Sequence, residues 1–234
     1  MVLLNDLDKV YNIDGGNEVQ ICTFSTNGDS LIYIRSNTIF YVSASDLLLE
    51  KSIQISKDGE PGVIYHGIPD WVYEEEVLGS DAAAWISRDG KYLAYASFDD
   101  TDVETFTYQI YGDGKGDYQY PEEVHLKYPK VGSKNPKLGL TIQDVETPTI
   151  KPIKKKNASS EFGDDHILGS VFWISNTKLG VIWTDRRQNH AIIVSYSPSN
   201  PDFEVVGFIR TYHFKCLPLK NYLDNENQRA KWLD

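Results

Sequence analysis

The sequence SRDGKYLAY at residues 87–95 decides the fold, because the chain repeats its pattern. Residues 25–33, STNGDSLIY, have the same arrangement: a serine, a turn with Asn-Gly or Asp-Gly, and then an apolar segment. A third and shorter copy, FWISNTKLGVIW, lies at residues 172–183. Asn-Gly and Asp-Gly supply the positive φ angles of a tight hairpin turn. The repeats therefore predict β-hairpins, each of which belongs to a unit of antiparallel strands.

Each copy continues into two further segments with strand character. The third strands are expected at residues 38–42, 104–111 and 191–196, and the fourth strands at 52–55, 122–127 and 203–209. In the second copy Phe106, Tyr108 and Ile110 alternate with polar residues, which is the period of a half-buried strand. Repeated units of four antiparallel strands are typical of a β-propeller. A β-sandwich also contains many short strands, but the aromatics at corresponding positions of the hairpins favour the propeller.

The repeats cover most of the chain. We expect an all-β fold for residues 1–210, a partial β-propeller of about three to four four-stranded antiparallel blades. About four blades are the minimum for a closed ring, so the open edges need a partner or further sequence. Residues 211–234 match none of the repeats and are expected to form a separate C-terminal tail.

Composition excludes several classes of function. The 234 residues carry a net charge of −11, with 23 Lys and Arg against 34 Asp and Glu, which argues against nucleic acid as a partner. The sequence contains no run of about 18 apolar residues and therefore predicts no transmembrane helix. The five histidines have no metal-ligand spacing, and no Gly-x-Ser-x-Gly motif is present. We therefore expect no metal, no cofactor and no catalytic residue in this chain.

Residues 70–77, DWVYEEEV, place three consecutive carboxylates behind two large aromatic side chains. They predict a short Glu-rich helical excursion over residues 71–78, with Asp70 as its N-cap. A solvated helical face is the simplest interpretation. The alternative is a clamp for an ammonium group, which offers three donors and no acceptor and forms strong charge-assisted bonds with carboxylates. The free amino terminus of a peptide would suit such a clamp.

The same stretch resembles the double-glutamate motif of the dipeptidyl peptidase IV family. Further matching segments follow in the family's order over roughly residues 19–197, and they include WISRDGKYLAYASFDDT at 85–101, YPKVG at 128–132, GDDH at 163–166 and WTDRRQN at 183–189. The resemblance implies an eight-bladed propeller followed by an α/β-hydrolase domain, with this chain as part of the propeller. It also implies a serine-type peptidase that removes dipeptides from amino termini.

The resemblance assigns roles to single residues. Glu75 and Glu76 match the positions that hold the α-ammonium group of the substrate, and Glu74 takes the flanking position. The family's Ser-Asp-His triad lies on the hydrolase domain, which is missing from this sequence, so we expect the chain alone to be inactive. Active members also carry an arginine upstream of the first hairpin. No arginine precedes Arg35 here, and Asp14 stands near the matching position.

One alternative function stays open at this point. Non-catalytic relatives, such as potassium-channel auxiliary subunits, keep the propeller and the glutamate motif, although the spelling Trp-Val-Tyr at residues 71–73 favours the peptidases. The resemblance further implies a peptide amino terminus as substrate, a hydrolase domain as partner and a homodimer formed through an arm on the propeller. It implies an extracellular or cell-surface location, as a secreted or type II membrane protein. Asn157 begins an Asn-Ala-Ser triplet and is a candidate glycosylation site in that setting.

Overall fold

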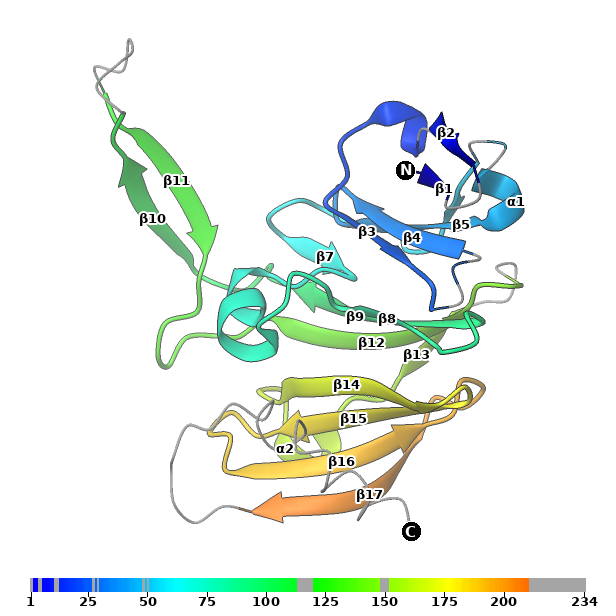
Figure 1. The fold of residues 1–234 in the computed structure, drawn as a ribbon. Coiled ribbons are helices and arrows are strands. Elements are labelled where there is room, and N and C mark those ends of the chain that lie inside the picture. Colours follow the sequence, from blue (N-terminus) through cyan, green and yellow to red (C-terminus); the bar gives the residue numbers. More distant parts are fainter. Residues whose placement is uncertain are drawn as a thin grey trace.

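The computed structural model describes residues 2–3, 6–10, 13–26, 28, 30–47, 49, 51–112, 120–147 and 152–210. Figure 1 shows three antiparallel sheets that lie face to face as successive layers, with a separate two-stranded hairpin that projects away from them. The predicted tail at residues 211–234 lies outside the described residues. Within the described residues, no helix has the length and apolar character needed to cross a membrane.

The first sheet has four strands in sequence order. They are β3 (Ile21–Phe24), β4 (Ser30–Arg35), β5 (Thr38–Ser43) and β6 (Ile53–Gln54). The two-residue turn between β4 and β5 is formed by Ser36 and Asn37, both with positive φ, as tight hairpins require. The strands expected at residues 38–42 and 52–55 are therefore confirmed. Shorter elements surround this sheet: β1 (Val2–Leu3), β2 (Asp6–Val10), η1 (Asp14–Gly16) and α1 (Ala44–Leu47).

The second sheet has an interrupted first strand. Its members are β7 (Ile64–His66), β8 (Ala84–Ile86), β9 (Tyr92–Asp99), β12 (Lys137–Asp144) and β13 (Ile153–Lys155), in the order β13-β12-β9-β7 with β8 also on β9. Both β7 and β8 pair with β9, at its end and at its beginning respectively. The two short strands thus act as one strand that is divided by an insertion.

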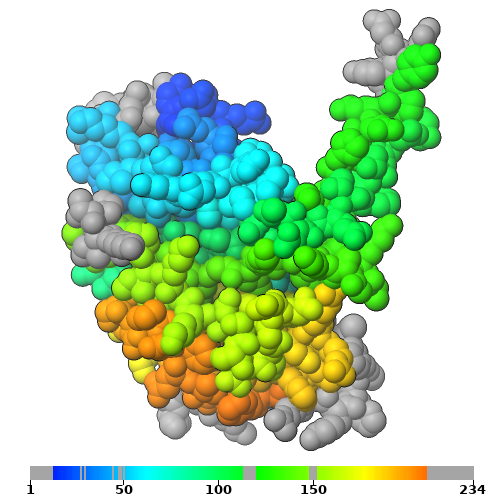
Figure 2. Space-filling view, turned by 180° about the vertical axis from the view of Figure 1, so that it is seen from behind, coloured from blue at the N-terminus to red at the C-terminus, as the bar shows by residue number. Residues whose placement is uncertain are grey.

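The structure corrects the assignment of two strands. Residues 104–111 and 122–127 do form strands, β10 (Thr105–Ile110) and β11 (Glu122–Lys127), but these pair only with each other and not with the second sheet. We call this hairpin the arm; it stands away from the body in both views (Figures 1 and 2). The expected half-burial of Phe106, Tyr108 and Ile110 is also wrong, because no second layer covers the arm and these side chains are 41%, 42% and 48% exposed.

The third sheet again has four strands in sequence order. They are β14 (Ile167–Ser175), β15 (Lys178–Thr184), β16 (His190–Tyr196) and β17 (Phe203–Arg210), and α2 (Ser159–Phe162) precedes them. The strands expected at residues 191–196 and 203–209 are confirmed as β16 and β17.

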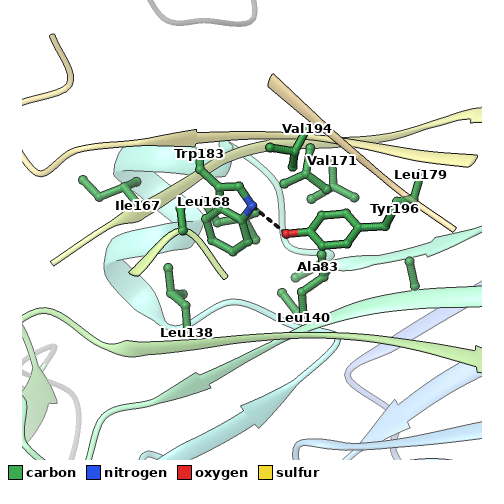
Figure 3. Close-up of a cluster of buried hydrophobic side chains, with 14 of the residues drawn as sticks. Ala83, Leu138, Leu140, Ile167, Leu168, Val171, Leu179, Trp183, Val194 and Tyr196 are labelled. Atoms are coloured by element: carbon green, nitrogen blue, oxygen red, sulfur yellow. Dashed lines mark hydrogen bonds between the residues drawn. The ribbon is translucent and has the colours of Figure 1, made fainter. Parts of the chain in front are cut away.

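Apolar side chains hold the sheets against one another. Alternate residues of β9 point to opposite faces of the sheet, so Leu93 and Tyr95 join the cluster shared with the first sheet. Phe98 joins the cluster shared with the third sheet. In that cluster the Trp183 indole N–H donates to the Tyr196 hydroxyl at 3.0 Å (Figure 3). Sheets stacked in sequence order through apolar faces confirm the all-β, partial propeller of four-stranded blades.

Candidate functional site

An excursion of the chain, residues 67–83, separates β7 from β8. Its two ends are tied to the sheet by backbone hydrogen bonds: Gly67 N–H donates to the Ala96 carbonyl at 2.9 Å, and Ala83 N–H donates to the Gly67 carbonyl at 2.8 Å. The excursion therefore leaves the sheet and returns to it at one point on β9. It is the candidate site, because it carries the glutamate motif.

The excursion contains the helix that the sequence predicts over residues 71–78. Its backbone widens into a π-helical turn, η2 (Tyr73–Leu78), and it ends at Gly79, whose φ of 58° is left-handed. π-Helical turns are rare and occur frequently at functional sites. Tyr73 is buried and packs against Phe98 of β9, with ring centroids 4.8 Å apart. This contact anchors one side of the helix on the sheet.

The acidic side chains of the helix are more exposed than Tyr73. Glu75 and Glu76 are exposed and Glu74 is half-buried. None of the three carboxylates has an ion pair or a hydrogen bond with a residue that the structure describes. Adjacent unpaired carboxylates repel one another, and an arriving cation relieves that repulsion. The structure thus presents Glu75 and Glu76 to solvent, and their role in binding an amino terminus stays a prediction.

Aromatic side chains connect the excursion to the base of the arm. The Trp71 ring is 38% exposed and lies 5.2 Å from the ring of Tyr128, which follows β11. Tyr128 in turn lies 6.3 Å from Phe106 of β10, and the Lys130 ammonium sits 4.8 Å above the Phe106 ring. The glutamates therefore lie on a segment with a second support besides the sheet.

Asp70 stands at the expected N-cap position, because its carbonyl accepts the Glu74 N–H at 2.9 Å and the N–H groups of Val72 and Tyr73 act on its carboxylate. The side chain is also buried, with 1% of its surface exposed. Burial raises the pKa of Asp70 to about 6, although the nearby N–H groups of Val72 and Tyr73 offset part of this shift. A second buried carboxylate, Asp100, follows β9 and is 0% exposed. Burial, reinforced by the charge of Asp70, raises the pKa of Asp100 to about 8.

Sequence reasoning missed this buried pair. An aspartate before a helix usually caps it, and the residue pattern alone does not reveal that Asp70 is turned inward. Asp100 lies in a run of polar residues that reads as an exposed turn. The burial of either residue depends on tertiary packing, such as that of Tyr73 on Phe98, which the residue pattern does not show.

Two other residues singled out from the sequence lie elsewhere. Asp14 forms an ion pair with Arg35 and accepts a hydrogen bond from the Tyr33 hydroxyl at 3.1 Å, so its carboxylate is used at the first sheet. Asn157 is half-buried, and its Nδ2 donates to the Leu138 carbonyl at 3.5 Å. Its role as a glycan acceptor stays a prediction. No cluster of three or more metal-ligating side chains occurs among the described residues.

Comparisons with known proteins show the family of this chain. A family model described as the N-terminal region of dipeptidyl peptidase IV matches residues 3–222. Venom dipeptidyl peptidase 4 of Vespula vulgaris is 43% identical over 188 residues, which cover 80% of this chain and 24% of the relative. Dipeptidyl peptidase 4 of Sus scrofa is 36% identical over 183 residues, which cover 76% of this chain and 23% of that relative. The chain thus spans about a quarter of the length of the curated relatives it matches.

Solved structures resemble the fold over most of the chain. The crystal structure of Porphyromonas gingivalis dipeptidyl peptidase 4 matches with a TM-score of 0.74 at 25% identity, covering 85% of this chain and 26% of that one. A putative dipeptidyl aminopeptidase IV of Bacteroides ovatus matches with a TM-score of 0.68 at 16% identity, and the match covers 90% of this chain and 26% of that one. The second likeness supports the fold alone.

Proposed function

The chain belongs to the dipeptidyl peptidase IV family, as part of its N-terminal β-propeller region, and we propose that it recognises the free amino terminus of a peptide substrate for a serine dipeptidyl peptidase. The single observation that carries this proposal is the pair Glu75 and Glu76. Both side chains are exposed and unpaired within the described residues, on a helical turn anchored to the sheet by Tyr73.

The proposed mechanism is a positioning one. The α-ammonium group of the substrate donates hydrogen bonds to Glu75 and Glu76, and each charge-assisted bond is worth about 1.5–3 kcal/mol. Fixing the amino terminus fixes which peptide bond reaches the nucleophile, so that dipeptides are released. We assign the nucleophile to a hydrolase domain, because this sequence holds no Gly-x-Ser-x-Gly motif. The propeller contributes binding and orientation, which lower the barrier without forming a covalent bond.

The test uses the protein that carries this chain together with its hydrolase domain. In that protein, Glu75→Gln and Glu76→Gln keep the shape of each side chain and remove its charge. Each change should lower kcat/KM toward an Xaa-Pro chromogenic substrate by at least about tenfold, the equivalent of one charge-assisted bond.

A matched control is Glu161→Gln, because Glu161 is an exposed glutamate on the separate helix α2. The kcat/KM of the Glu161→Gln variant should stay within about twofold of that of the parent protein. Glu74→Gln should have a smaller effect than either neighbour, since Glu74 is only flanking. Unchanged kcat/KM in both the Glu75 and the Glu76 variants would mean that the glutamates are only solvent-exposed side chains and do not bind the substrate.

We also propose that the arm mediates formation of a homodimer. One face of this two-stranded ribbon carries Phe106, Tyr108 and Ile110, and Val124 and Leu126 lie opposite them on β11. The other face is polar, with Thr107 hydrogen-bonded to His125 at 2.9 Å. An isolated two-stranded hairpin is marginally stable in water, and an exposed apolar stripe of this kind marks an interaction surface.

Sedimentation equilibrium of the same protein tests the dimer. Tyr108→Asp places a charge in the centre of the apolar stripe and should shift the population toward the monomer. Thr107→Asp, at the neighbouring position on the polar face, is the matched control and should leave the distribution unchanged. A Tyr108→Asp protein that remains dimeric at the concentration of the parent dimer would contradict the proposal.

An extracellular location is supported by the venom relative named above. In that setting we propose that Asn157 carries a glycan, which would replace its weak hydrogen bond to the Leu138 carbonyl. Mass spectrometry of the protein secreted from insect cells should find a glycan on the peptide that contains Asn157. An unmodified peptide from fully secreted protein would remove this assignment.

A further inference from the structure

A ring contact between Trp71 and Tyr128 joins the glutamate segment to the base of the arm. Trp71 begins the helix of residues 71–78, and its ring centroid lies 5.2 Å from that of Tyr128, with the two ring planes tilted by 57°. Aromatic rings about 4.5–7 Å apart in such arrangements attract one another beyond the effect of the area that they bury. The contact therefore helps to hold the helix, and the proposed function gives it no role.

Trp71 lies close to the glutamates along the helix. Residues four apart are neighbours on a helix surface, so the position of Trp71 is one turn from that of Glu75. Tyr73 makes the other aromatic contact of this helix, with Phe98 of the sheet. The helix thus has two aromatic supports, one on the sheet and one on the base of the arm.

Tyr128 has supports of its own that do not involve Trp71. Its N–H donates to the Glu104 carbonyl at 3.0 Å, next to the start of the arm. Its ring also lies 6.3 Å from the ring of Phe106 on β10. The Lys130 ammonium sits 4.8 Å from the Phe106 centroid, within the range of an attractive cation–π contact. Tyr128 is therefore held at the base of the arm through both its backbone and its ring.

The loop that follows Tyr128 is tied to the third sheet. Arg186, which follows β15, donates to the Ser133 carbonyl at 2.6 Å and to the Asp165 carboxylate at 3.1 Å. Hydrogen bonds from a charged donor are stronger than those between neutral groups. The support that Trp71 receives from Tyr128 is thus backed by a packed sheet, although Tyr128 itself lies outside the sheets.

We propose that Tyr128 is a positioning residue for substrate binding: through Trp71 it holds the helix in the orientation in which Glu75 and Glu76 receive the α-ammonium group. This inference rests on the proposed function. Hydrogen bonds weaken steeply when their distance or angle departs from the optimum. A helix that keeps only its contact with the sheet shifts more readily and therefore binds the ammonium group less well. The base of the arm supports substrate binding in this way without touching the substrate.

The first experiment follows the helix in the unliganded protein that carries this chain. An aromatic pair contributes a factor of about two to twelve to an equilibrium constant, so Tyr128→Leu should accelerate amide exchange of residues 73–78 by about threefold to tenfold. Exchange in β15 should stay as in the parent protein. Unchanged exchange of residues 73–78, or an equal acceleration in β15, would overturn the inference.

Two control variants isolate the ring of Tyr128. Tyr128→Phe keeps the ring and removes only the hydroxyl group, so it should exchange as the parent protein does. Tyr120→Leu removes a tyrosine ring at the opposite end of β11 that is 82% exposed, and it should also leave the exchange of residues 73–78 unchanged. Acceleration by Tyr120→Leu equal to that by Tyr128→Leu would contradict a specific role of the contact.

A double-mutant cycle tests whether Tyr128 acts through Trp71. Trp71→Leu removes the same contact from the other side and should also accelerate exchange of residues 73–78. Adding Tyr128→Leu to Trp71→Leu should produce no further acceleration, because the contact is already lost. Independent effects that multiply in the double variant would show that Tyr128 does not act through Trp71 and would overturn the inference.

The kinetic experiment uses the protein that carries this chain together with its hydrolase domain. Its readout is the ratio of kcat/KM for an Xaa-Pro substrate to kcat/KM for the des-amino analogue. Tyr128→Leu should lower this ratio by about threefold to tenfold, because only the substrate with an amino group uses the glutamates. Tyr128→Phe and Tyr120→Leu should retain the parent ratio. An unchanged ratio in Tyr128→Leu would overturn the positioning role.

These readouts separate the inference from the proposed function. Faster exchange in Tyr128→Leu, together with Glu75 and Glu76 variants of unchanged kcat/KM, would reject the proposed function and with it the substrate-binding half of the inference, while the support of the helix by Tyr128 would stand. Exchange in Tyr128→Leu equal to that of the parent protein would reject the inference whatever the kinetics of the glutamate variants.

Discussion

At the scale of single residues, the position of the glutamates depends on Gly67. The chain leaves the sheet at this residue, whose φ of +73° is a backbone conformation that residues other than glycine rarely adopt. A Cβ atom at this position would lie 2.8 Å from Ile39 Cδ1 and 2.9 Å from Ile34 Cδ1. Both isoleucines are fully buried between the first two sheets. Glycine is therefore required both by the backbone turn and by the close packing behind it.

A matched pair of glycine variants separates these two requirements. Gly67→Ala should lower the free energy of unfolding by about 1–2 kcal/mol for the left-handed backbone and by about 1–3 kcal/mol more for overpacking. Gly79→Ala shares the positive φ but has nothing within 4 Å of its Cβ, so only the backbone cost applies. Urea denaturation of both variants measures the difference. Equal losses would mean that the buried isoleucines move aside without cost.

At the residue level, the binding role of Glu75 and Glu76 stays a prediction, and the burial of Asp70 was not predicted. Three carboxylates in a row are visible in any sequence, and the resemblance named two of them. The orientation of one aspartate depends instead on tertiary packing, because the same side chain can cap a helix or be buried beside it. Asp70 combines both positions, because it precedes the helix and is buried, and its burial cannot be seen in the residue pattern.

At the scale of elements, the alternation of β10 predicted a strand but not its partner. Apolar and polar residues alternate in a solvent-exposed hairpin as well as in a strand of a larger sheet. The true third strand of the second sheet, β12 (Lys137–Asp144), has the same signal in Leu138, Leu140 and Ile142, all of which are buried. Sequence proximity favoured the nearer segment, and the arm was therefore assigned to the blade. An insertion of this size between paired strands cannot be read from periodicity.

A buried lysine joins two of the sheets. Lys155 of β13 is 6% exposed, and its ammonium donates to the carbonyls of Ser197, Pro198 and Asn200, each at 2.8 Å. Burial lowers the pKa of Lys155 to about 8, while three acceptors match the three donors of the charged form. The side chain thus closes the turn between β16 and β17 against the second sheet.

Replacing this lysine should weaken the junction between the sheets. Lys155→Met keeps most of the apolar stem and removes all three donors, which should cost about 2–4 kcal/mol of unfolding free energy. Lys154→Met changes the exposed neighbour and should stay within about 0.5 kcal/mol of the parent protein. Thermal denaturation at pH 7 compares the two. If Lys155→Met were as stable as the parent protein, water would replace the ammonium group without loss of stability.

At the scale of the whole molecule, stacked sheets explain why the repeats were readable. A blade between two neighbours buries both of its faces, so the middle strands are nearly continuous apolar runs bounded by turn residues. β9 of the second sheet is such a strand, and its hairpin is the copy at residues 87–95; β15, whose hairpin is the copy at residues 172–183, has the same apolar run. Fold class and family could therefore be predicted. The projecting arm and the division of the first strand of the second sheet could not.

The stacked sheets also give the site its character. The sheets provide a fixed support, and both the excursion with Glu75 and Glu76 and the arm leave the second sheet or its connections. Trp71 and Tyr128 bring the two insertions into contact. The molecule thus combines a packed support with two projecting segments, one proposed to bind a peptide amino terminus and the other a second copy of the protein.

The central claim is that Glu75 and Glu76 bind the α-ammonium group of the substrate, and a double-mutant cycle between protein and substrate tests it most directly. The kcat/KM of the protein that carries this chain is measured for an Xaa-Pro substrate and for its des-amino analogue, with and without the combined change Glu75→Gln and Glu76→Gln. Removing the amino group should slow the parent protein at least about tenfold more than the variant. An equal loss in both proteins would contradict the account.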